Sequence, residues 1–160
     1  MSPLPAGTPA PPFALPGWSA AGEREYRLAD MAGRPLVLAF YPGDDTPVCT
    51  RQLCSYERSA PDLDAVGATV WAISTQDIAS HRRFADKHGL TMPLLADVDG
   101  AVHRAYGLGG VLNRRAVFVV DGDGAIAWSE ASLTSVRYVG ADRIAEAVRR
   151  VTEGAGAAGR

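Results

Sequence analysis

The stretch Leu36-Val-Leu-Ala-Phe-Tyr-Pro-Gly-Asp-Asp-Thr-Pro-Val-Cys-Thr-Arg-Gln-Leu-Cys54 organises the rest of the chain. Its first part, through Tyr41, is an unbroken apolar run that predicts a buried strand. The prolines and the glycine that follow end this strand and prevent a helix in the connection. Beyond them the sequence predicts a helix that begins near Val48 or Cys49, with Thr46 or a neighbour as its cap.

The chain contains two cysteines, Cys49 and Cys54, and both lie in this stretch. The predicted helix start places Cys49 in the first helical turn. There, unpaired backbone N–H groups and the positive end of the helix dipole point at the sulfur and favour the thiolate over the thiol. Cys49 is therefore the predicted nucleophile.

Cys54 lies five residues further along the same predicted helix. An ideal helix separates the Cα atoms of such a pair by roughly 8 to 9 Å, whereas a disulfide needs them within about 7 Å. If the two cysteines bond, the helix must first unwind locally. The spacing thus predicts a switch between a wound reduced form and an unwound oxidised form, and it disfavours a static structural bridge.

Length and composition limit the possible classes of protein. The chain has 160 residues, of which 47% are hydrophobic, and this suits one domain with one substantial core. A net charge of −2 with interspersed signs does not suggest binding to nucleic acid or to an anionic membrane. The proline-rich beginning resembles neither a signal peptide nor a membrane span. With two thiols, a reducing cytoplasm is the expected location, where such a pair is more often catalytic or redox-sensing than structural.

The remaining pattern predicts one folded domain between two simpler segments. Residues 1–12 are expected to be an extended or mobile lead-in, residues 13–153 the domain, and residues 154–160 a flexible tail. The predicted strands are 13–15 and 25–28, which form an N-terminal hairpin, and then 36–41, 69–74, 92–96, 116–120 and 125–130. The predicted helices begin near residue 48 and then span 61–66, 77–88, 101–106 and 141–152.

Strands that alternate with helices, followed by a hairpin and a closing helix, predict the α/β class. We expect a central mixed sheet with helices on both faces. The reactive loop would follow the carboxyl end of a central strand, which is where open α/β sheets place their sites.

The motif Pro42-x-x-x-Thr46-x-x-Cys49 resembles the signature of the peroxiredoxins. Cys54 resembles the resolving cysteine of the bacterioferritin comigratory protein (peroxiredoxin Q) subgroup. Further blocks that resemble the family extend the likeness to roughly residues 12–151; they are Ala72-Ile-Ser, His81 to Leu90, Pro93 to Asp97, Arg104 to Gly107 and Arg115 to Asp121. The resemblance implies a thioredoxin-like fold and reduction of hydrogen peroxide and organic hydroperoxides, with thioredoxin or a similar dithiol as reductant. We expect a monomer or a homodimer and no cofactor.

The resemblance also implies a role for each matching residue. Cys49 would attack the peroxide and become a sulfenic acid. Cys54 would then condense with this sulfenic acid and form an internal disulfide. Thr46 would accept a hydrogen bond from the peroxide. Arg115 would stabilise the thiolate and the developing charge, with Arg114 as the neighbouring candidate. The other two matching residues would support the site, Pro42 by shielding the sulfur from water and Gln52 by bracing the arginine.

Two alternative functions remain open from the sequence. One is a redox sensor or interaction module in which oxidation changes partner binding. The other is a copper chaperone of the Sco type, although its cysteines are usually separated by three residues rather than four. The histidines at 81, 88 and 103 all lie on predicted helices, and we expect them to be structural or solvated rather than metal ligands.

Overall fold

The computed structural model describes residues 2–109, 115–132 and 137–158, with backbone alone for 155–158. A seven-stranded sheet has the order β2-β1-β5-β4-β3-β6-β7. The strands are β1 (Ala14–Ser19), β2 (Gly22–Arg27), β3 (Leu36–Phe40), β4 (Thr69–Ser74), β5 (Leu94–Ala96), β6 (Arg115–Val120) and β7 (Ile126–Ser132). The helices are η1 (Leu28–Met31), α1 (Pro47–Arg58), α2 (Ala60–Ala65), α3 (Ile78–His88), α4 (Ala101–Ala105) and α5 (Ala141–Ala158).

The sheet is mixed, as the sequence predicts. Strand β3 runs parallel to β4 and antiparallel to β6, and β4 runs parallel to β5. The two hairpins, β1–β2 and β6–β7, add antiparallel strands at both edges. Strand β3 therefore lies inside the sheet, with both of its edges paired.

Burial along β3 shows how the two halves of the core meet. All five of its residues have no exposed surface. Val37 and Ala39 belong to one apolar cluster, whereas Leu36, Leu38 and Phe40 belong to another. Because successive strand residues point to opposite faces, a strand that is apolar at every position must be covered on both.

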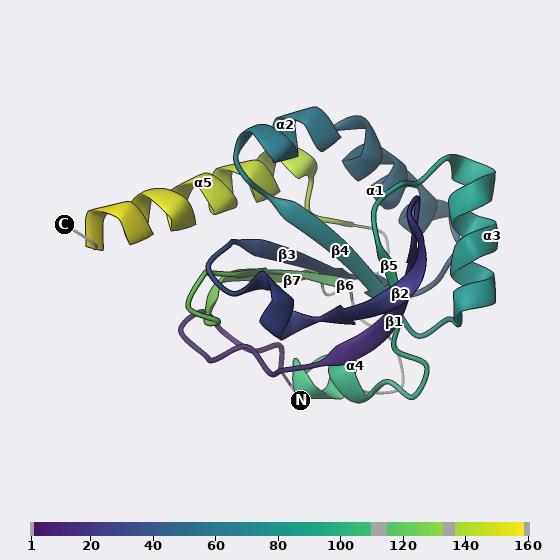
Figure 1. Ribbon diagram of the computed structural model, residues 1–160, viewed down its shortest axis with the longest axis horizontal. Helices are drawn as coiled ribbons and strands as arrows, with labels where there is room; N and C mark the ends of the chain where they lie inside the picture. The colour runs from purple at the N-terminus through teal and green to yellow at the C-terminus, as the bar shows by residue number, and fades with distance from the viewer. Residues whose placement is uncertain (1, 110–114, 133–136, 159–160) are drawn as a thin grey trace.

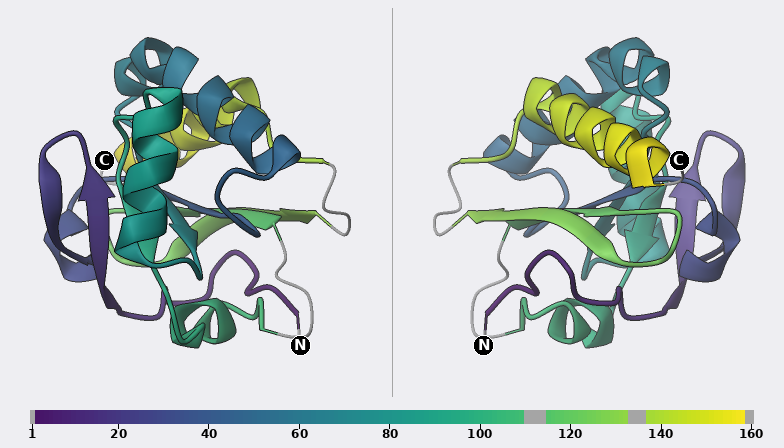
Figure 2. Two further views of the ribbon diagram at one scale, coloured as in Figure 1. Left: turned by 90° about the vertical axis from the view of Figure 1, so that its right-hand side faces the viewer. Right: turned by 90° about the vertical axis from the view of Figure 1, so that its left-hand side faces the viewer.

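The helices divide unequally between the two faces (Figures 1 and 2). α1, α2, α3 and α5 cover one face, and α4 covers the other together with the N-terminal segment. The predicted α/β architecture with helices on both faces is thus confirmed. In the described part of the chain, no helix combines the length and the hydrophobicity that a membrane span requires.

The N-terminal hairpin is longer than the sequence indicates. The connection between the predicted strands 13–15 and 25–28 narrows to the two residues between Ser19 and Gly22, because Gly22 adopts a φ of +102° that lets the strands reverse sharply. Gly17 is part of β1 and pairs with Arg24. A side chain at Gly17 would come within 2.7 Å of the Tyr26 ring, so the close packing of that ring requires glycine here.

The two ends of the chain also differ from the simplest expectation. The lead-in contains a turn in which Thr8 N donates to Pro5 O, and it pairs with the β6–β7 hairpin, since the amides of Gly7 and Ala10 donate to the carbonyls of Ile126 and Gly124. Helix α5 runs to Ala158 rather than ending at residue 152. Alanine, the strongest helix former, recurs after Gly154 and offsets the glycines there. In Figure 1 this end of α5 extends away from the sheet.

Candidate active site

The loop after β3 places Cys49 in the first turn of α1. The helix begins at Pro47, and Thr50 N donates to Thr46 O as its first helical hydrogen bond. The Thr46 hydroxyl does not cap the helix and instead donates to Gly43 O at 3.0 Å. Because its hydrogen is used in this bond, the lone pairs of that hydroxyl can accept a hydrogen bond from another molecule. Thr46 is exposed, whereas Cys49 is fully buried.

The pairing of β6 with β3 brings Arg115 to the cysteine. Ala116 lies opposite Phe40, the last residue of β3, so Arg115 lies beside the start of the loop. Its Nη1 lies 3.2 Å from Cys49 Sγ and 2.5 Å from Gln52 Oε1. The guanidinium is buried, with 3% of the residue exposed. A buried positive charge in contact with sulfur is the arrangement that stabilises a thiolate and a neighbouring oxyanion. The alternative arginine, Arg114, lies outside the described residues.

Gln52 is itself held in place by a further hydrogen bond. Its Nε2 donates to the Tyr56 hydroxyl at 3.0 Å, and this hydroxyl donates to Val139 O at 2.6 Å. Burial raises the pKa of Tyr56 well above its usual value, so the hydroxyl keeps its hydrogen. A continuous chain of polar contacts thus joins Cys49 to the segment before α5. Sequence reasoning missed Tyr56, although its position seven residues after Cys49 places it on the same helical face.

Pro42 and Cys54 are less closely tied to this cluster. Pro42 is half-buried and directly precedes the buried Gly43. Cys54 is half-buried and packs against the apolar cluster to which Cys49 belongs. Both cysteines are free thiols on the unbroken helix α1.

Removal of the Tyr56 hydroxyl is expected to destabilise the fold. In a Tyr56→Phe variant, Val139 O and Gln52 Nε2 lose a buried partner, which costs about 1–3 kcal/mol in the free energy of unfolding. Urea denaturation measures this loss. Tyr26→Phe is the matched control, because Tyr26 is equally buried but its hydroxyl has no hydrogen-bond partner among the described residues. Equal losses in both variants would contradict the bracing role.

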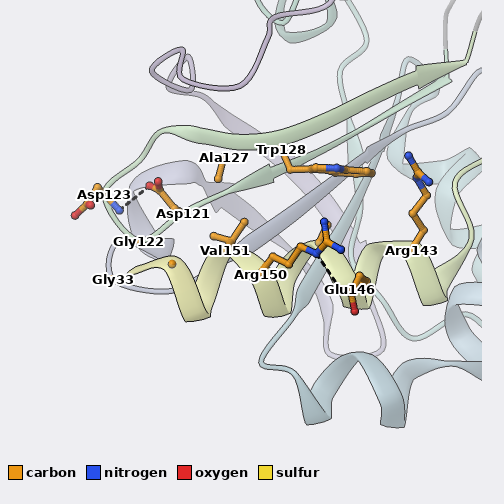
Figure 3. Close-up of a pocket in the computed structure, with 12 residues that line it drawn as sticks. Gly33, Asp121, Gly122, Asp123, Ala127, Trp128, Arg143, Glu146, Arg150 and Val151 are labelled. Atoms are coloured by element: carbon orange, nitrogen blue, oxygen red, sulfur yellow. Dashed lines mark hydrogen bonds and ion pairs between the residues drawn. The ribbon is translucent and has the colours of Figure 1, made fainter. Parts of the chain in front are cut away.

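A separate hollow of about 850 Å³ lies between β7 and α5. Figure 3 shows Trp128 on one wall and Arg143, Arg150 and Val151 on the helix opposite. Its lining includes none of the six residues that the sequence singled out. The chemistry-bearing side chains converge at Cys49 instead, so we place the candidate site there.

The described residues also contain no group of three or more histidine, cysteine or acidic side chains placed to hold a metal ion.

Comparison with known proteins identifies the family. Residues 6–129 match the model of the AhpC/TSA family. The chain is also 34% identical over 145 residues to a putative peroxiredoxin of Mycobacterium tuberculosis, a match that covers 85% of this chain and 90% of that protein. The chain belongs to the AhpC/TSA family of peroxiredoxins.

Other relatives place this peroxiredoxin near one subgroup. It is 37% identical over 124 residues to the chloroplastic peroxiredoxin Q of Oryza sativa subsp. japonica. This match covers 75% of this chain and 56% of the rice protein. The chain therefore spans a little over half the length of this plant relative.

Solved structures agree with this placement. Peroxiredoxin Q of Xanthomonas campestris is 28% identical with a TM-score of 0.77, and the match covers 86% of this chain and 90% of that one. Peroxidoxin BcpB of M. tuberculosis is 28% identical with a TM-score of 0.82, and the match covers 92% of this chain and 98% of that one. The predicted thioredoxin-like fold and the predicted likeness to peroxiredoxin Q are confirmed.

Proposed function

We propose that this peroxiredoxin is a thiol-dependent peroxidase that reduces hydrogen peroxide and organic hydroperoxides. The observation that carries the proposal is the contact between Arg115 Nη1 and Cys49 Sγ, at 3.2 Å in a buried setting. A thiolate is the reactive form of cysteine, and a guanidinium beside it favours attack on an O–O bond because negative charge spreads onto the oxygens. Family membership supports the same chemistry.

In the first step, the Cys49 thiolate attacks one peroxide oxygen. A sulfur–oxygen bond forms and the O–O bond breaks. Cys49 becomes a sulfenic acid, and the second oxygen leaves as water or an alcohol after taking up a proton. The Thr46 hydroxyl accepts a hydrogen bond from the incoming peroxide, since its own hydrogen is committed to Gly43 O. Arg115, which contacts the sulfur before the reaction, stabilises the negative charge that spreads onto the oxygens.

In the second step, the Cys54 thiol condenses with the sulfenic acid, which gives an intramolecular disulfide and releases one water. This requires α1 to unwind between the two cysteines, because an intact helix holds them roughly 8 to 9 Å apart. Gln52 lies within that segment, so its contacts with Arg115 and Tyr56 must break as the disulfide forms. A thioredoxin-like dithiol then returns both cysteines to thiols and is itself oxidised to a disulfide.

Reaction of the reduced protein with limiting hydrogen peroxide tests this proposal. We expect both thiols to disappear and the intact mass to fall by about 2 Da, because two hydrogens are removed. Repeated peroxide consumption should follow when thioredoxin and its reductase are supplied. Stoichiometric oxidation without coupled turnover would favour the redox-sensor alternative, and unchanged thiols would contradict both functions.

A further inference from the structure

The Asp44 carboxylate, two residues before Thr46, is buried against α3. Only 4% of its side chain is exposed. Oδ1 accepts a hydrogen bond from the Tyr41 hydroxyl at 2.6 Å, and Oδ2 accepts one from Ser80 Oγ at 2.7 Å. Oδ2 also lies 2.7 Å from His81 Nδ1. Burial is the main cause that raises the pKa of Tyr41 well above its usual value, and the charge of Asp44 is the second. Tyr41 therefore remains a hydrogen-bond donor.

Three contacts of the His81 ring bear on its hydrogens: Nε2 faces Leu95 O, and Nδ1 faces both Asp44 Oδ2 and, at 3.4 Å, the Tyr41 hydroxyl. Its side chain has no exposed surface, and Nε2 lies 2.9 Å from Leu95 O. A carbonyl oxygen only accepts, so Nε2 must carry a hydrogen. Nδ1 faces a carboxylate oxygen, and without a hydrogen there two lone pairs would oppose each other. Since Tyr41 donates its hydrogen to Asp44 Oδ1, the hydrogen between Nδ1 and Oδ2 belongs to the His81–Asp44 pair itself. An imidazolium that donates from Nε2 to Leu95 O and from Nδ1 to the Asp44 carboxylate satisfies these contacts.

This ion pair fixes the loop that carries Thr46. The Asp44 amide donates to Gln76 Oε1 at 3.0 Å, while Ser74 Oγ donates to the same oxygen at 2.7 Å. Gly43 is buried and so close to Gln76 that a Cβ there would come within 3.3 Å of the amide nitrogen. The Gly43 carbonyl in turn accepts the Thr46 hydroxyl hydrogen. A shift of Asp44 would move this carbonyl and turn the Thr46 hydroxyl.

We propose that His81 is a positioning residue of the peroxidase reaction, an inference that rests on the proposed function. Through its ion pair with Asp44, it holds the turn from Gly43 to Thr46 in one geometry. That geometry keeps the lone pairs of Thr46 available to the peroxide, beside the helix turn that carries Cys49. His81 touches neither the peroxide nor the sulfur, so it acts on the rate only through the loop.

Two substitutions of His81 separate its two hydrogen bonds. The amide nitrogen of asparagine can take the place of Nδ1 and still donate to Asp44, whereas that of glutamine takes the place of Nε2 and donates to Leu95 O. We expect His81→Gln to lower the rate constant of Cys49 oxidation by hydrogen peroxide by about tenfold to a hundredfold, because misplacement of a site group has effects of this size. His81→Asn should stay within about threefold of wild type.

Lys87→Met is the matched control on the same helix. Lys87 binds Asp45, the exposed neighbour of Asp44, at 2.8 Å, and both side chains of this pair are about half or more exposed. Exposed ion pairs contribute little, so this variant should react at the wild-type rate. Urea denaturation of all three variants checks that each one is folded under the assay conditions.

A spectroscopic measurement tests the ion pair without any reaction. In the reduced wild-type protein labelled with 15N-histidine, the His81 ring should show a directly bonded hydrogen on each nitrogen at pH 7. In Asp44→Asn the Nδ1 hydrogen should be lost or shifted. The chain has three histidines, so His81→Asn assigns the signals by difference.

The outcomes separate this inference from the proposed function. A wild-type protein that consumes no peroxide would remove the function, while the NMR spectrum would still report the ion pair. Three results would overturn the inference: a His81 ring with one bare nitrogen, a folded His81→Gln variant that reacts at the wild-type rate, or a folded His81→Asn variant as slow as His81→Gln. If His81→Gln does not fold, the rate of His81→Asn decides.

Discussion

Replacement of Cys49 by serine is expected to abolish peroxide reduction, down to the background rate measured without protein. A serine hydroxyl is not ionised near neutral pH and cannot supply the electron pair that a thiolate offers to an O–O bond. The substitution is nearly isosteric, so the buried first turn of α1 should keep its packing. Peroxide consumption with excess dithiol, followed in parallel with the intact mass, measures the effect.

Cys54→Ser is the matched control for this change, since it makes the same substitution on the same helix. It should keep the rate of the first oxidation and stop there, with a sulfenic acid on Cys49 that a dimedone-type reagent traps. The opposite pattern, with a reactive Cys49→Ser and an inert Cys54→Ser, would reverse the assigned roles. Loss of reactivity in both variants would place Cys54 in the first step.

Substitution of Arg115 by glutamine should slow Cys49 oxidation by about a hundredfold to a thousandfold, which is the effect of removing one preorganised donor from a charge-stabilising site. The guanidinium is buried and contacts both Cys49 Sγ and Gln52 Oε1. Arg115→Lys keeps the charge but not the planar fork, so one ammonium cannot reproduce both contacts at the same geometry. We expect it to be at least about tenfold slower than wild type. Stopped-flow oxidation of the reduced protein gives these rate constants.

Arg150→Lys serves as the control for Arg115, because Arg150 is on the surface and its side chain is 78% exposed. It should react like wild type. A wild-type rate in Arg115→Gln would show that the guanidinium packs against the sulfur without stabilising the reaction. Unfolding measurements on Arg115→Gln separate this result from a general loss of structure.

The sequence predicts the local parts of this molecule well. The apolar run from Leu36 to Tyr41 predicts a buried strand, and β3 spans Leu36–Phe40. The helix predicted to begin near Val48 or Cys49 begins at Pro47, because proline is well suited to the first turn of a helix. The predicted end of α5, at residue 152, was wrong by six residues. Gly154 and Gly156 indicate a helix end, but the alanines beside them favour the helix and extend it to Ala158.

The histidines show where pattern reading reaches its limit. His81 lies between Ile78 and Phe84 on the apolar face of α3, which indicates burial. Its partners, Asp44 and Leu95 O, come from separate parts of the chain, 37 and 14 residues away. No local sequence pattern predicts that Asp44 in the loop and His81 on α3 contact each other.

By itself, the sequence determined the chemistry that this protein carries: two cysteines on one helix, a loop that ends in Thr46, and the strands and helices around them. These features depend on neighbours within a few residues, where backbone geometry and propensity decide the outcome. The resemblance to the peroxiredoxins implied that Arg115 meets the sulfur, but the physical reason for the contact lies in the tertiary structure. Arg115 reaches Cys49 because β6 pairs antiparallel with β3 in one register, and a shift by one residue would turn its side chain to the other face of the sheet.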